Sequence, residues 1–62
     1  MVSDQPTRKI VKALTEAGFQ RVRTTGSHSW WEKNGKGISV PDGHRTISAG
    51  VVRKIMKAIE EM

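Results

Sequence analysis

The chain contains no cysteine and only two histidines. Without cysteine there is no disulfide, and so few histidines leave no four-ligand zinc site of the usual kind. A chain of 62 residues must therefore depend on apolar packing alone. We expect marginal stability, because conformational entropy offsets most of the free energy gained by burial.

Long apolar runs are also missing. No stretch approaches the roughly 20 apolar residues needed to cross a bilayer. The polar start Ser3-Asp4-Gln5 lacks the apolar segment of a secretory signal. We expect a cytoplasmic protein with no membrane partner, folded as a single domain over residues 1–62.

Acidic residues are fewer than basic ones, six against eleven, which gives a formal charge of +5. On so small a surface this charge attracts polyanions such as RNA, DNA or an acidic protein. The same charge also fits an ordinary solvated surface. The candidate phosphate contacts are the basic side chains in the middle of the chain, namely Arg21, Arg23, Lys33 and Lys36.

Two segments carry apolar residues at helical spacing. The first stripe comprises Ile10, Ala13, Leu14 and Ala17. The second comprises Val52, Ile55, Ile59 and Met62, joined at its margin by Val51 and Ala58. These stripes predict a helix over about residues 7–17, capped by Asp4 or Thr7, and a last helix that starts after Ser48.

The segment between the helices alternates large and polar side chains, as β-strands do. Strands are predicted over residues 19–25, 28–33 and 37–40. Gly26-Ser27 separates the first two, and the hairpin signal Asn34-Gly35 separates the last two. The order predicts an α+β fold, α-β-β-β-α, with a three-stranded antiparallel sheet and both helices on one face of it.

Period two sorts the middle strand into two faces. One face carries His28, Trp30 and Glu32, and the other carries Ser29, Trp31 and Lys33. One tryptophan is therefore expected in the core, and the pattern leaves open which one. The exposed ring is suited to base stacking or to anchoring a protein partner.

His28 is the residue best suited to catalysis, because an imidazole both takes and gives protons near neutral pH. RNA cleavage requires such proton transfer, and cations that stabilise the charge growing on the phosphate. His28 with nearby basic residues meets these needs without a metal ion. An ordinary exposed histidine is the alternative, and His44 is a weaker second candidate for proton transfer.

Gly26 and Ser27, just before His28, are candidate RNA contacts. Glycine lets a backbone approach a phosphate closely, and the serine hydroxyl and backbone N–H groups can hold one. A plain connecting turn is the alternative. The carboxylates show no metal-binding spacing and no phosphate-binding glycine loop is present, so we expect no metal and no small-molecule cofactor.

Five motifs in a fixed order carry a family resemblance. They are Lys9-Ile10-Val11-Lys12-Ala13-Leu14, Ala17-Gly18-Phe19, Gly26-Ser27-His28, Val40-Pro41 and Ser48-Ala49-Gly50-Val51-Val52-Arg53-Lys54-Ile55. In this order and spacing the chain resembles the HicA family, the small RNA-cleaving toxins of type II toxin–antitoxin pairs.

The resemblance implies a fold like that of double-stranded-RNA-binding domains. It also implies an endoribonuclease that cleaves mRNA, with His28 of the Gly-Ser-His motif essential for cleavage, and neutralisation by an antitoxin of HicB type. Two other functions remain open at this stage, a non-catalytic RNA-binding module and an inactive subunit that binds the antitoxin.

Overall fold

The computed structural model describes residues 3–61, which form two helices and two antiparallel sheets. The helices are α1 (Thr7–Glu16) and α2 (Ala49–Glu60). The larger sheet has the strand order β2-β3-β4, and these strands are Gln20–Thr25, His28–Lys33 and Lys36–Val40. The smaller sheet pairs β1 (Gln5–Pro6) with β5 (Thr46–Ile47).

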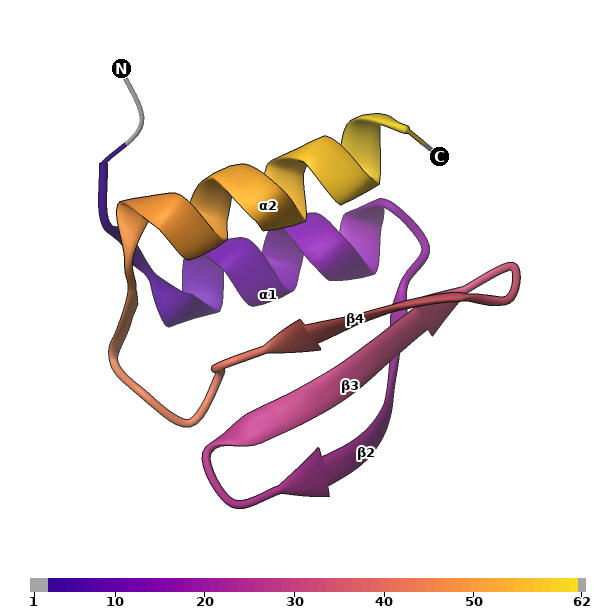
Figure 1. Cartoon of the computed structure of the whole chain (residues 1–62), viewed down its shortest axis with the longest axis horizontal. Coiled ribbons are helices and arrows are strands. Elements are labelled where there is room, and N and C mark those ends of the chain that lie inside the picture. The colour runs from indigo at the N-terminus through magenta and orange to yellow at the C-terminus, as the bar shows by residue number, and fades with distance from the viewer. Residues whose placement is uncertain (1–2, 62) are drawn as a thin grey trace.

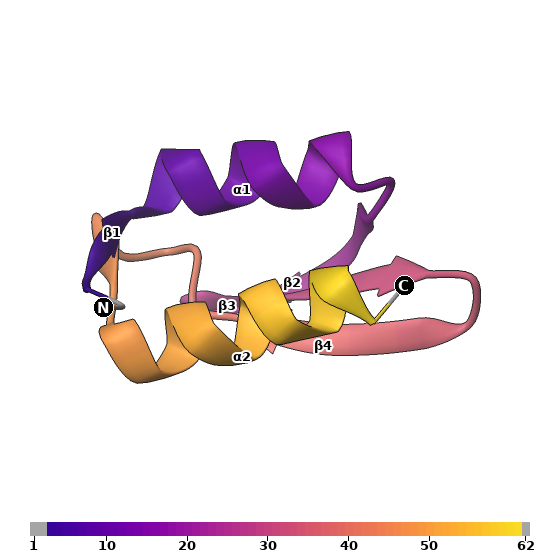
Figure 2. The same cartoon turned by 90° about the horizontal axis from the view of Figure 1, so that it is seen from above.

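Both helices lie on the same side of the three-stranded sheet (Figure 1). Seen from above, they lie side by side and run in the same direction (Figure 2). The predicted α+β architecture and its α-β-β-β-α order are confirmed, with both ends of α1, the start of α2 and the ends of the three main strands within one residue of prediction. No helix within residues 3–61 is long and apolar enough to span a membrane.

The core fills the space between the helices and the sheet. Its buried apolar side chains come from both helices and from the strands and the segments that join them: Ile10, Leu14, Phe19, Trp31, Val40, Ile47, Val52 and Ile55. Burial of each such side chain contributes about 1.5–3 kcal/mol. Ile59 packs at the margin of this core, as its position in the second stripe predicts, and Met62 lies outside the described residues.

Two short turns fix the register of the three-stranded sheet. Asn34 and Gly35 have φ angles of 51° and 83°, as the predicted two-residue hairpin between β3 and β4 requires. Gly26, with a φ of 61°, opens the turn that joins β2 to β3. This turn places His28 at the first position of β3, opposite Thr25.

The predicted alternation of β3 is confirmed. Ser29 and Trp31 are buried against the helices, whereas His28, Trp30 and Glu32 are exposed on the opposite side. We call the side that carries His28 the outer face of the sheet, and the side covered by the helices the inner face. The tryptophan that enters the core is Trp31.

The sequence does not predict the pairing of β1 with β5, which ties the start of α1 to the start of α2. The prediction that Asp4 or Thr7 caps α1 is wrong. The N-cap residue of that helix is Pro6, which supplies no side-chain hydrogen bond. The Thr7 hydroxyl donates instead to the backbone carbonyl of His44. Asp4 Oδ1 accepts a hydrogen bond of 2.8 Å from the backbone N–H of Ala49, so this carboxylate caps α2.

Candidate functional site

The imidazole of His28 is exposed on the outer face. Its nearest polar side chain is that of Ser27, whose Oγ lies 3.4 Å from Nδ1, at the long end of hydrogen-bond distances. Neither ring nitrogen is tied into the core. The ring is therefore accessible to a substrate that approaches the sheet from solvent.

Two hollows meet at His28 and Trp30. The smaller, of about 150 Å³, lies over β2 and β3 and is also lined by Arg23. The larger, of about 430 Å³, passes over β4 to α2, where Lys54 forms part of its wall. His28 thus shares one hollow with Arg23, from a strand, and the other with Lys54, from a helix.

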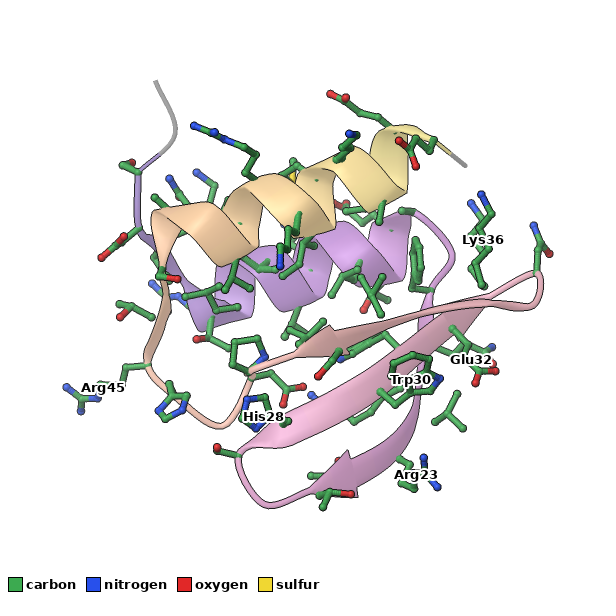
Figure 3. The ribbon with its side chains drawn as sticks, viewed as in Figure 1. Arg23, His28, Trp30, Glu32, Lys36 and Arg45 are labelled. Carbon is green, nitrogen blue, oxygen red and sulfur yellow. The ribbon has the colours of Figure 1, made fainter. Side chains whose placement is uncertain are left out.

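Arg23 is the predicted phosphate contact that the structure brings to His28. It lies opposite Trp30 in the pairing of β2 with β3 and so belongs to the outer face. Figure 3 shows His28, Trp30 and Glu32 in a row along β3, with Arg23 beside Trp30 and Glu32 rather than beside His28. Arg23 and His28 line the same small hollow.

Arg21 lies on the other side of the same strand, because a bulge at Val22 separates the two arginines in the register. Its Nη2 forms an ion pair with Asp42 Oδ2 at 3.0 Å. Its guanidinium carbon lies 5.1 Å from the centroid of the Trp31 ring, within cation–π range. Arg21 therefore joins the edge of the inner face and lies away from His28.

Lys33 and Lys36 are paired with each other at the far end of β3 and β4, on the inner side of the sheet. The Lys33 ammonium donates to the backbone carbonyl of Ala17, just after α1, where a cation also compensates the helix dipole. Lys36 lines a separate hollow with Glu61, and Figure 3 shows it pointing away from His28. The structure brings neither lysine to the histidine.

Gly26 and Ser27 form the turn directly before His28. The Ser27 carbonyl accepts a 2.9 Å hydrogen bond from the Gly43 N–H. A Cβ atom at Gly43 would come within 2.7 Å of the Ser27 backbone, so the segment after β4 packs closely on this turn. A Cβ atom at Gly26 would meet nothing within 4 Å, so this side of the turn is open to solvent.

Asp42 is a positioning residue that the sequence analysis does not select. Its carboxylate accepts hydrogen bonds from Ser29 Oγ at 2.8 Å and from Trp31 Nε1 at 3.3 Å, besides the ion pair with Arg21. Ser29 Oγ also lies 3.0 Å from Thr24 Oγ1 on β2. Asp42 thus holds the segment after β4 against the strand that carries His28.

Lys54 is the second residue that the sequence reading does not select. A basic residue on a helix surface is common, and only the packing of α2 beside β4 brings this one to the same hollow as His28. His44 lines neither of the two hollows at His28. Among residues 3–61, no group of three or more histidine, aspartate and glutamate side chains is arranged to hold a metal ion.

Comparison with known families adds an independent observation. A family model described as "HicA toxin of bacterial toxin-antitoxin" matches residues 7–60. The chain belongs to the HicA toxin family. Its role is that of a toxin, and membership in this HicA family implies an antitoxin as partner.

The match covers almost all of the 62 residues, including both helices up to Glu60 and the Gly26-Ser27-His28 turn. No curated protein and no solved structure matches the chain. The expected likeness to double-stranded-RNA-binding domains therefore stays a prediction.

Proposed function

We propose that this HicA toxin is an endoribonuclease that cleaves mRNA without a metal ion, and that His28 is its catalytic residue. The observation that carries the proposal is the exposure of His28 at the meeting point of two hollows, one also lined by Arg23 and the other by Lys54. An imidazole beside two cations is the arrangement that metal-free cleavage of a phosphodiester needs.

The reaction begins when the 2′-hydroxyl of one nucleotide loses its proton and its oxygen bonds to the adjacent phosphorus. The bond from phosphorus to the 5′-oxygen of the next nucleotide then breaks, and that oxygen takes up a proton. The products end in a 2′,3′-cyclic phosphate and a 5′-hydroxyl. His28 carries out one of the two proton transfers, and water completes the other.

Arg23 and Lys54 have a different task in this scheme. Each lines one of the two hollows that His28 also lines, so they hold the non-bridging oxygens and stabilise the negative charge that grows on the phosphate. Gly26 and Ser27 contact the RNA from the solvent-exposed side of their turn. Arg21, Lys33 and Lys36 contribute only to the positive electrostatic potential of the protein, because their side chains bond to other groups or point away from His28.

The direct test is incubation of purified protein with single-stranded RNA in the presence of EDTA. We expect fragments from the wild type and a fall in rate of about 100-fold or more for His28→Ala. The variant should keep its melting temperature, because the ring is exposed. Full activity of the variant would defeat the assignment, and cleavage that EDTA abolishes would show a metal-dependent reaction.

A matched pair of variants on α2 tests whether Lys54 contacts the RNA. Lys54 and Arg53 are neighbours on one helix, both exposed, but only Lys54 lines the hollow at His28. In a binding measurement in which the RNA is not cleaved, log affinity falls as log salt concentration rises. Lys54→Gln should make this slope less steep by about 0.7, the value for one phosphate contact to a single strand. Arg53→Gln should leave it nearly unchanged. Equal slopes for the two variants would remove Lys54 from the site.

A non-catalytic RNA-binding module remains distinguishable in the same assay, because it would retard RNA in a gel and produce no fragments.

We further propose that the antitoxin is a HicB-like protein that covers the outer face and that the pair acts in the cytoplasm. An acidic partner suits the charge of +5. Binding of a HicB-like antitoxin to the outer face should protect RNA from cleavage, and binding without protection would place the antitoxin elsewhere.

A further inference from the structure

Trp30 presents an immobilised aromatic ring next to His28. It is 37% exposed, whereas its neighbour Trp31 is 4% exposed. Its Nε1 donates a 2.6 Å hydrogen bond to Glu32 Oε2. Its ring also lies across Gly37 of β4, where a Cβ atom would come within 2.1 Å of the ring. An exposed indole with a hydrogen bond on one side and a backbone beneath it is held in one orientation.

The surroundings of this ring match one nucleotide of an RNA strand. Trp30 and His28 are two residues apart on the same face of β3, roughly 6.6 Å along the strand. Both side chains line both hollows, together with Arg23 in one and Lys54 in the other. A flat ring beside basic side chains is the usual combination in proteins that bind single-stranded nucleic acid.

We propose that Trp30 stacks against an unpaired base of the RNA, next to the phosphate at which His28 transfers a proton, and so restricts the toxin to single-stranded sites. This proposal rests on the proposed nuclease function. In a duplex each base is already stacked on its neighbours, so its face is closed to the indole. Around the ring, the basic residues Arg23 and Lys54 outnumber the carboxylate of Glu32 that accepts from Nε1, and this excess of positive charge favours a nucleotide over an apolar protein anchor.

The test measures binding to a single-stranded oligoadenylate, with His28→Ala present in every protein so that the RNA stays intact. Binding is scored without cleavage, so the result is independent of whether His28 is catalytic. The comparison adds Trp30→Leu or Trp30→Phe to that background. The control is Met56→Ala, which removes another exposed apolar side chain, from α2. The same RNA annealed to its complement provides the duplex.

We expect Trp30→Leu to bind the single strand about 5- to 150-fold more weakly, because stacking on an aromatic ring is lost. Trp30→Phe should retain most of the affinity, Met56→Ala all of it, and binding of the duplex should be insensitive to residue 30. Tryptophan fluorescence of the Trp30 protein should change when the single strand binds, and this change should be absent in Trp30→Phe.

Unaltered affinity in a folded Trp30→Leu protein would overturn the proposal. So would equal loss in Trp30→Leu and Trp30→Phe, since a phenyl ring still stacks. If Trp30→Leu fails to fold, the fluorescence decides, and a saturating single strand that leaves the emission of the Trp30 protein unchanged refutes stacking. Loss of binding to the antitoxin alone, with RNA affinity intact, would assign the ring to a protein interface.

Discussion

Trp30 and Trp31 are consecutive on β3, yet they belong to opposite faces of the sheet. Trp31 is enclosed by the core, and its polar atom is bonded to Asp42. Trp30 lies in the open between two hollows, with its polar atom bonded to Glu32. The inner face therefore holds the molecule together, whereas the outer face is free to meet a substrate.

The same division runs through the basic residues. Arg21 and Lys33 bond to groups of the protein itself, a carboxylate and the carbonyl that follows α1. Arg23 and Lys54 line the hollows at His28. Arg21 and Lys33 lie on the inner face and Arg23 on the outer face, whereas Lys54 lines its hollow from α2. The surroundings of each side chain, rather than residue type, separate cations that stabilise the fold from cations available to a phosphate.

The largest effect expected on stability comes from truncation of the buried ring. Trp31→Ala should lower the free energy of unfolding by about 3–5 kcal/mol, because it leaves a cavity in the core. Trp30→Ala should lower it by about 1 kcal/mol, as for an average substitution. Urea denaturation followed by circular dichroism measures both, and equal losses would break the distinction between the two faces.

The next largest effect concerns Asp42. Asp42→Ala deprives Arg21, Ser29 and Trp31 of their common acceptor and should cost about 1.5–3 kcal/mol of stability. Asp4→Ala is the control, since this aspartate only caps α2 and its loss should cost about 1 kcal/mol. Thermal melts of the two variants give the comparison, and a smaller effect at Asp42 than at Asp4 would contradict the role assigned to Asp42.

The smallest effects concern two glycines and differ in sign. Gly37→Ala should destabilise by about 1 kcal/mol, because the new methyl group displaces the Trp30 ring. Gly50→Ala should stabilise by about 0.5–1 kcal/mol, because this glycine lies in α2 with nothing near its Cβ position. Chemical denaturation measures the free energy of unfolding of both variants. If Gly37→Ala is as stable as Gly50→Ala, the Trp30 ring is not fixed against β4.

Much of the fold follows from local periodicity. Helical spacing located both helices, and period two assigned His28 and Trp30 to one face of β3. The Asn34-Gly35 pair predicted its hairpin, because the required backbone conformation favours those two residues. Each of these features is decided by residues within a few positions of one another.

The remainder depends on contacts between distant segments, for which the sequence carries no local signal. Asp4 caps a helix 45 residues away, and Lys33 bonds to a carbonyl 16 residues earlier. Asp42 reaches residues 11 to 21 positions before it. Lys54 comes to His28 only because α2 packs beside β4. His28 and Arg23 are therefore predictable as candidates from the sequence, whereas Lys54 is not.

Analysis of the ends of the RNA fragments tests most directly whether the 2′-hydroxyl of the RNA is the nucleophile, as the proposed metal-free mechanism requires. An RNA oligonucleotide and its 2′-deoxy counterpart are incubated with the toxin in the presence of EDTA. The masses of the products, measured by mass spectrometry, identify their end groups. We expect 2′,3′-cyclic phosphate and 5′-hydroxyl ends from the RNA, and no cleavage of the deoxy strand. Fragments that carry a 5′-phosphate, or cleavage of the deoxy strand, would contradict the mechanism.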